Sequence, residues 1–201
     1  MNNLLNPDTL RLRFSSPAPV ASVAGDSAAA ALQQESYTPA AVLVPVVDRE
    51  NGMTVLFTRR TAHLQDHAGQ ISFPGGRTEP GDESPLATAL RETEEEIGLE
   101  RGCVEILGRL PDYRTGTGFR ITPVVGLVRP PLELRPDDFE VAEVFEVPLG
   151  FLLDPSNHQR NSMMRDGHRR EFYAMPYRHY YIWGATAGIL MNLYSVLTSQ
   201  S

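Results

Sequence analysis

The sequence predicts an α/β fold, because apolar runs of strand type alternate with segments of helical periodicity. Residues 40–47 and 121–128 are rich in apolar and β-branched side chains, as in buried strands. Residues 85–97 and 183–198 have the apolar spacing of helices. With 201 residues and 41% hydrophobic content, the chain is long enough for one domain with a well-buried core and too short for two. We place this domain at residues 38–201.

Residues 1–37 are predicted to form an N-terminal extension. They contain a stretch rich in Ala, Ser and Pro, which is typical of a linker and not of a core. The pattern also allows a short helix near residues 8–14.

The remaining elements follow in order along the chain. The runs at 40–47 and 54–58 flank the turn signal Asn51-Gly52 and predict a hairpin. Further strands are expected at 71–73, 104–107, 121–128, 171–174 and 179–183, and polar loops at 114–118 and 160–170.

Composition excludes several classes of protein. The net charge of -7 and the pI near 5.2 argue against binding to nucleic-acid backbones. No apolar run reaches 18 residues, so we expect no transmembrane helix, and the N-terminus lacks the pattern of a signal peptide. The single cysteine, Cys103, is expected to be a small core residue and agrees with a reducing, cytoplasmic location.

The stretch from Phe73 to Leu99 combines a glycine-rich turn with a capped helix. Ser84 can cap the N-terminus, Pro85 suits the first helical position, and Gly98 suits the C-terminal cap. An apolar stripe for packing is formed by Leu86, Leu90, Thr93 and Ile97.

Three acids, Glu92, Glu95 and Glu96, share a different face of this helix and would repel one another at neutral pH. A hard divalent cation would relieve the repulsion, and carboxylate oxygens suit Mg²⁺ or Mn²⁺. Arg91 borders these acids and is placed to orient a carboxylate. On composition alone, an ordinary solvated helix face is an equally good interpretation.

The pattern resembles the Nudix box, G-x5-E-x7-R-E-U-x-E-E-x-G-U, in which U is a bulky apolar residue. The positions that match in register are Glu83, Arg91, Glu92, Glu95, Glu96, Gly98 and Leu99. Gly76 lies one residue early, which lengthens the loop by one residue, and Thr93 replaces a larger apolar side chain. The resemblance implies a Nudix α/β/α sandwich on a mixed β-sheet, with the loop-helix-loop of the box presenting its acids to a cleft.

The segment before the box, LFTRRTAHLQDHAGQISFPGG at residues 56–76, resembles the signature L-L-T-x-R-S-x3-R-x3-G-x3-F-P-G-G of coenzyme A diphosphatases. Gln65 departs from it, because the family pattern has Arg there. Pieces at 110–128, 139–149 and 181–190 are also similar to that family, and the longer loop after Gly76 is shared with it.

The resemblance implies metal-dependent hydrolysis of a diphosphate bond. Glu92 and Glu96 are the first choice as ligands of Mg²⁺ or Mn²⁺, with Glu95 as a further ligand or the base and the Gly76 carbonyl as an extra ligand. Glu140, from outside the box, is a candidate base, and a surface acid beside a strand is an equally good interpretation of it. Candidate substrate-binding residues are Arg59, Arg60, Gly69, Phe73, Gly75 and Arg120.

The implied substrate is coenzyme A or acyl-CoA, cleaved to 3′-phospho-AMP and 4′-phosphopantetheine or its acyl form. ADP-ribose, a dinucleotide or another nucleoside diphosphate derivative is the alternative substrate. A Nudix-fold sensor that binds a nucleotide without cleaving it is a further alternative, although such a protein would be expected to have lost acids from the box. The expected partner is therefore a small nucleotide, with neither nucleic acid nor membrane, and a homodimer is allowed.

Other side chains give weaker signals. His63 and His67 have the spacing of a metal-binding pair, but Leu64 stands where such a motif needs Glu, so a loop is the better interpretation. The aromatic residues near the C-terminus are expected to be core residues, with stacking on adenine as the alternative: Tyr177, Tyr180, Tyr181 and Trp183.

Overall fold

The computed structural model describes residues 6–15, 36–63, 68–165 and 167–199. Its helical elements are α1 (Pro7–Ser15), α3 (Pro85–Ile97), η2 (Arg101–Cys103), α4 (Leu149–Leu152), η3 (Pro155–Asn157) and α5 (Gly184–Thr198). Its strands are β1 (Thr38–Val47), β2 (Thr54–Arg60), β3 (Ile71–Ser72), β4 (Gly75–Arg77), β5 (Val104–Arg109), β6 (Tyr113–Arg114), β7 (Phe119–Val128), β8 (Val141–Pro148), β9 (Gln159–Arg165), β10 (His168–Tyr177) and β11 (Tyr180–Trp183).

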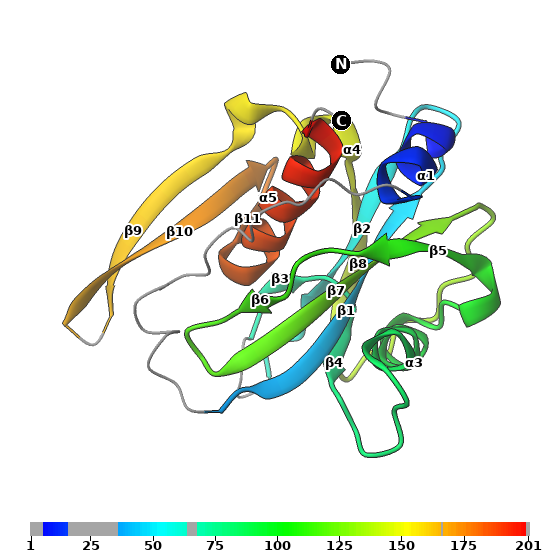
Figure 1. The fold of residues 1–201 in the computed structure, drawn as a ribbon. Coiled ribbons are helices and arrows are strands. Elements are labelled where there is room, and N and C mark those ends of the chain that lie inside the picture. The colour runs from blue at the N-terminus through cyan, green and yellow to red at the C-terminus, as the bar shows by residue number, and fades with distance from the viewer. Residues whose placement is uncertain (1–5, 16–35, 64–67, 166, 200–201) are drawn as a thin grey trace.

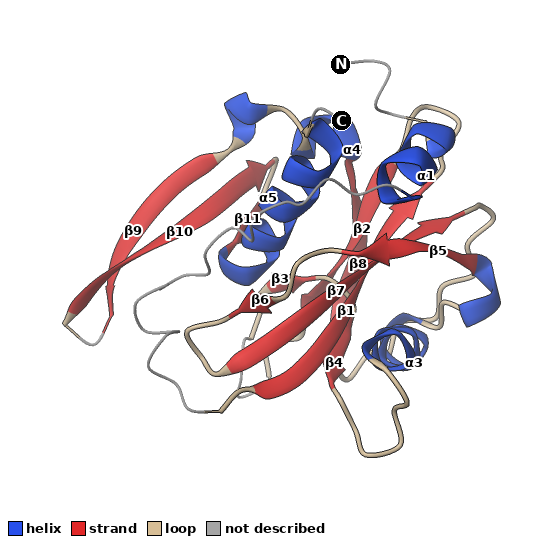
Figure 2. Ribbon diagram, viewed as in Figure 1, coloured by secondary structure: helices blue, strands red, loops and turns tan. Residues whose placement is uncertain are grey.

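A mixed sheet lies between helices, as Figures 1 and 2 show. In the described part of the chain this sheet has eight strands, and its main order is β3-β2-β1-β7-β5. In addition, β4 pairs with β1, β6 pairs with β7, and β8 pairs with β2. β1 and β7 run parallel over their whole lengths, whereas the other pairs in this sheet are antiparallel. Helix α3 covers one face and α5 the other, which confirms the predicted α/β/α arrangement on a mixed sheet.

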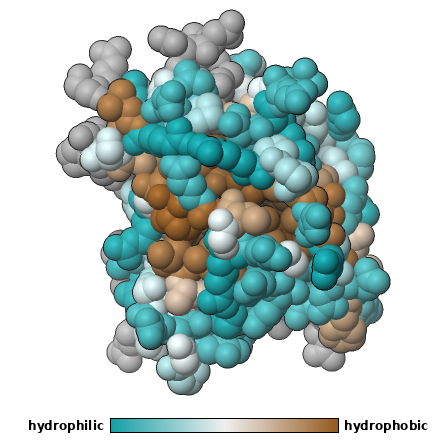
Figure 3. Space-filling view, turned by 90° about the vertical axis from the view of Figure 1, so that its right-hand side faces the viewer, coloured by the Kyte–Doolittle hydropathy of each residue, from teal (hydrophilic) through white to brown (hydrophobic). Residues whose placement is uncertain are grey.

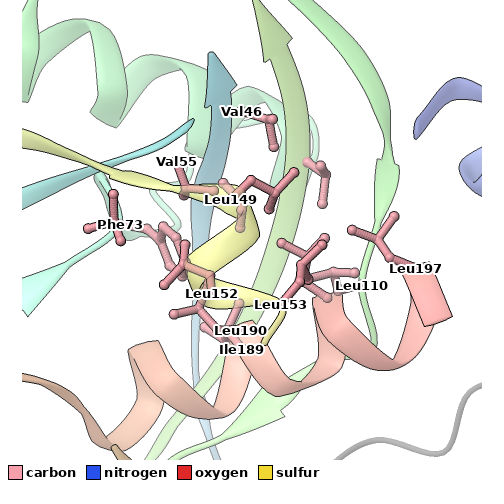
Figure 4. Close-up of a cluster of buried hydrophobic side chains, with 14 of the residues drawn as sticks. Val46, Val55, Phe73, Leu110, Leu149, Leu152, Leu153, Ile189, Leu190 and Leu197 are labelled. Atoms are coloured by element: carbon pink, nitrogen blue, oxygen red, sulfur yellow. The ribbon is translucent and has the colours of Figure 1, made fainter. Parts of the chain in front are cut away.

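Alternating residues of β1 supply both faces of the sheet. Leu43 and Val47 pack in the cluster that contains Ile97 of α3, whereas Val44 and Val46 pack in the cluster that contains α5. The second cluster is drawn in Figure 4, where side chains from several strands meet those of α4 and α5. A strand buried on both sides needs apolar residues at nearly every position, which explains why residues 40–47 are so uniformly apolar.

The predicted hairpins form. β1 and β2 pair antiparallel with Val46 opposite Val55, and β10 and β11 pair through Pro176 and Tyr181. The interpretation of residues 160–170 as a solvated loop was wrong, because β9 and the start of β10 form a projecting antiparallel hairpin there (Figure 1). Apart from Met163, Met164 and Gly167, residues 160–170 are polar, so the apolar alternation that normally indicates a strand is absent.

Helix α1 belongs to the core, although the extension had been interpreted as lying outside it. Leu10 is fully buried and Phe14 is 8% exposed in the cluster that also contains α5. Arg13 donates a hydrogen bond to the backbone oxygen of Ser199, so the two ends of the described chain meet. The boundary at residue 37 stays a prediction.

Two predictions of burial were wrong. Cys103 is exposed, because it ends η2 at the edge of the sheet, and the ring of Tyr181 is 46% exposed on β11. Tyr177 and Tyr180 do pack against the core cluster.

Figure 3 shows an apolar band across one face of the molecule, bordered by hydrophilic side chains. Among the described residues, no helix is long and apolar enough to cross a membrane.

Candidate active site

The caps predicted for α3 are present. The Ser84 hydroxyl accepts a hydrogen bond from the Ala87 N–H at 3.2 Å, and Pro85 occupies the first turn. Gly98 adopts φ 68°, in the left-handed region, and its N–H donates to the Glu94 carbonyl. These caps fix where the helix begins and ends, and therefore which way its acids point.

The apolar stripe of α3 packs on the sheet as predicted. Ile97 is fully buried, and Leu86 and Leu90 pack against the same cluster. Thr93 fits where the box normally has a larger apolar residue, because its hydroxyl donates to the Ala89 carbonyl at 2.6 Å and is thereby satisfied. The packed stripe directs the neighbouring acids toward β4.

Two of these acids meet the glycine backbone of β4. The Gly75 N–H donates to Oε2 of Glu96 at 3.2 Å. A Cβ atom at Gly76 would lie 2.5 Å from the carboxyl carbon of Glu92, so the missing side chain is the space that this carboxylate occupies. Gly75 has φ 149°, and a Cβ there would lie 2.6 Å from the Cα of Val42 on β1. The two glycines therefore let the acids approach the strand closely.

Arg91 holds a carboxylate that the sequence analysis did not single out. Its guanidinium binds Asp82 with two hydrogen bonds, Nε to Oδ1 at 3.0 Å and Nη2 to Oδ2 at 2.9 Å. Nη1 also donates to Glu92 and to Glu95, each at 3.0 Å. Asp82 stands at an unspecified position of the box pattern, so no sequence signal marked it. The Arg91 guanidinium holds the pKa of Asp82 well below its usual range.

Burial dominates the electrostatics of Glu96. The residue is 6% exposed, and this burial raises the pKa of its carboxyl to about 8. The Gly75 N–H and Arg60 oppose the rise, while the charges of Glu92 and Glu140 add to it. Burial likewise raises the pKa of Glu92, with Arg91 opposing it. The interpretation as an ordinary solvated helix face was therefore wrong for Glu96.

The loop before β8 brings Glu140 to the same place. The backbone N–H groups of Arg135 and Asp137 donate to carbonyls at the end of α3, at 2.8 and 2.9 Å. The Thr61 N–H then donates to the Glu140 carbonyl at 2.9 Å. Arg60, at the end of β2, lies between the acids, with Nη1 3.7 Å from Glu96 and Nη2 3.9 Å from Glu140.

Other predicted substrate-binding residues contact different groups. Arg59 pairs with Glu143 at 2.9 Å, and the Tyr180 hydroxyl donates to the same carboxylate at 2.6 Å. Arg120 is half-exposed on β7, with Nε 3.8 Å from Asp112.

Phe73 and Gly69 are placed by the fold and not by contact with the acids. Phe73 is 2% exposed, and its ring stacks on Phe57 with centroids 5.0 Å apart, so it is a core residue (Figure 4). Gly69 adopts φ 70° in the turn before β3. Gln65 and His67 lie outside the described residues.

The oxygens around Gly76 have the chemistry of a site for a hard divalent cation. Glu92 and Glu96 are crowded carboxylates whose pKa values burial raises, and a cation would remove that conflict. Glu95 is turned toward Arg91 and is 60% exposed. With the side chains in these positions, no three His, Cys, Asp or Glu residues of the described chain converge as a metal cluster. Glu92 and Glu96 are therefore the carboxylates that could hold a divalent cation here.

The family model and the similar sequences indicate the same family. Residues 37–166 match the model of the NUDIX domain. An uncharacterized Nudix hydrolase NudL of Enterobacter sp. (strain 638) is 44% identical over 154 residues, covering 77% of this chain and 80% of that protein. The NudL of Yersinia pestis (strain Pestoides F) is 42% identical, covering 77% of each.

Among solved structures, an Ap4A hydrolase of C. elegans is 21% identical with a TM-score of 0.47, covering 56% of this chain and 81% of that one. RenU, a Nudix hydrolase of M. smegmatis, is 23% identical with a TM-score of 0.48, covering 58% and 74%.

Proposed function

Because this chain belongs to the Nudix hydrolase family, whose members cleave diphosphate bonds with divalent metal ions, we propose that its substrate is coenzyme A or acyl-CoA. The products are 3′-phospho-AMP and 4′-phosphopantetheine or its acyl form, and the cofactor is Mg²⁺ or Mn²⁺. The observation that supports diphosphate chemistry here is the approach of Glu92 and Glu96 to the backbone of Gly75 and Gly76.

In this proposal Glu92, Glu96 and the Gly76 carbonyl hold the metal. When bound, the ion polarises the phosphate oxygens and lowers the pKa of water. Glu140 is the proposed base, because its carboxylate lies across Arg60 from Glu96 and its side chain is 43% exposed, so water can reach it. Glu95 stays a candidate for the same role.

Arg60 and Arg91 have different proposed roles. The contacts of Arg60 with Glu96 and Glu140 are longer than hydrogen bonds, so its donors can turn to a phosphate without breaking a tight pair. Arg91 instead makes short hydrogen bonds to three acids and orients them, which makes it a positioning residue. Arg59 and Arg120 stay candidates for contacts with outer phosphates.

The choice of coenzyme A is supported by the signature at residues 56–76. Its Gly75 and Gly76 form the strand that the acids approach, and Phe73 anchors that strand in the core. Arg60, another residue of the signature, is the cation beside Glu96. Gln65 stands where the signature has Arg, and a role for that position in specificity stays a prediction.

Product analysis tests the proposal. The protein is incubated separately with coenzyme A, its 3′-dephospho form and ADP-ribose, each with Mg²⁺, with Mn²⁺ and with a chelator. We expect 3′-phospho-AMP from coenzyme A only when metal is present, and slower turnover of the 3′-dephospho form. Cleavage of ADP-ribose alone would retain the diphosphatase chemistry and refute the coenzyme A assignment.

A further inference from the structure

An exposed aromatic ring lies beside the acids of the site. Phe139 is 64% exposed, although it directly precedes Glu140, the proposed base. Its ring contacts that of His63, with centroids 4.8 Å apart and planes inclined at 57°. A large apolar ring with this exposure gains little from burial in the folded protein. The exposed ring is therefore available to contact a ligand.

The backbone holds this ring in place. The Phe139 carbonyl accepts a hydrogen bond from the Thr61 hydroxyl at 2.8 Å, and the Phe139 N–H donates to Oδ1 of Asp137 at 2.9 Å. The same loop is tied to the end of α3 through the Asp137 N–H and the Glu96 carbonyl. The backbone that carries the ring is thus tied to the helix that carries the acids, which limits the positions open to the ring before a ligand binds.

The ring belongs to the residue next to one of these acids. Phe139 and Glu140 are consecutive residues, and Arg60 lies between the Glu140 and Glu96 carboxylates at 3.9 and 3.7 Å. In a nucleoside diphosphate only a ribose separates the base from the first phosphate. The base of a diphosphate held at Arg60 and Glu96 can therefore reach this loop.

We propose that Phe139, supported by His63, stacks on the nucleobase of the substrate and so determines which diphosphates bind well. The inference rests on the proposed function and adds a binding residue to it. Because stacking uses the face that every base has, the ring selects for the presence of a base and not for its identity.

The aromatic residues near the C-terminus are less suitable for this role. The ring of Tyr180 already stacks on Phe145, with centroids 3.7 Å apart, and its hydroxyl is bound to Glu143. Trp183 has an edge contact with Phe172. The rings of Tyr180 and Trp183 are thus engaged within the protein, and Tyr181 is 46% exposed on β11. Phe139 is more exposed and directly precedes Glu140.

The test compares Phe139→Ala and Phe139→Trp with the wild-type protein. Binding of two ligands is measured by calorimetry with a chelator present, so that neither is cleaved: ADP-ribose, and diribosyl diphosphate, which has a ribose in place of the adenosine. Loss of stacking is expected to raise Kd for ADP-ribose about fivefold or more in Phe139→Ala, while Phe139→Trp stays near wild type. Kd for diribosyl diphosphate should not change. Leu12→Ala, which truncates a side chain that is 68% exposed on α1, is the matched control and should leave both values unchanged.

An equal rise in Kd for both ligands would show a merely structural role of Phe139, and an unchanged Kd for ADP-ribose would refute stacking. Binding of ADP, measured by calorimetry on the wild type and Phe139→Ala, separates this inference from the proposed function because it needs no turnover. A higher Kd for ADP in Phe139→Ala supports stacking by Phe139 even if coenzyme A is not cleaved. An equal Kd for ADP overturns the stacking proposal even if coenzyme A is the substrate.

Discussion

Replacing Glu96 by Gln should stabilise the metal-free protein at pH 8. Burial raises the pKa of this carboxyl from 4.5 to about 8, so the folded state binds a proton more tightly than the unfolded state. The contribution of Glu96 protonation to the free energy of unfolding is fully present below pH 4.5, and it is lost as the pH rises to about 8. Gln stays neutral at every pH, and its side-chain oxygen can still accept the hydrogen bond of the Gly75 N–H.

The magnitude follows from the shift in pKa. Each pKa unit corresponds to about 1.4 kcal/mol, so the wild-type protein should lose roughly 3–5 kcal/mol from this group between pH 4.5 and pH 8. The carboxyls whose pKa values are lowered, including those of Asp82 and Glu105, lose their stabilising effect only at more acidic pH. They do not contribute to the change between pH 5 and pH 8.

The assay is denaturant unfolding at pH 5 and pH 8 with a chelator present. We expect the wild-type free energy of unfolding to fall by a few kcal/mol, and the Glu96→Gln variant to show a much smaller fall. Glu94→Gln on the same helix is the control, because Glu94 is exposed and pairs only with Arg101 among the described ion pairs. If the free energy of unfolding falls equally with pH in the wild type and in Glu96→Gln, burial does not raise the pKa of Glu96.

The remaining predictions concern activity and the Arg91 contacts. Gly76→Ala should displace the Glu92 carboxylate and lower kcat on the order of 100-fold, while Gly81→Ala, where a Cβ meets open space, should have wild-type kinetics. Arg91→Lys cannot keep both hydrogen bonds to Asp82 and should lose about 1–3 kcal/mol of stability, against less than about 0.5 kcal/mol for the exposed Arg101→Lys, both measured by denaturant unfolding. Chelation should abolish hydrolysis, and added Mg²⁺ or Mn²⁺ should restore it in a product assay; activity that persists in chelator contradicts the metal requirement.

Local sequence patterns were sufficient for α3 and its acids. Ser84, Pro85 and Gly98 determine the helix ends through contacts within a few residues, and the 3.6-residue period places Glu92 and Glu96 off the apolar stripe. The strands β1 and β7 were equally clear, because strands buried on both faces are apolar along their length.

The resemblance had named Glu140 and Arg60 as candidates, but only the tertiary structure decided how distant groups meet these acids. Asp82 and the loop containing Phe139 and Glu140 reach the site through hydrogen bonds to Arg91, Thr61 and the end of α3, and no periodicity marks such partners. Burial of Glu96, and therefore its raised pKa, likewise depends on segments far apart in the chain. The sequence determines local conformation because caps and side-chain periodicity act between residues that lie within one or two helical turns of each other. Contacts between remote segments depend on the packing of the whole domain.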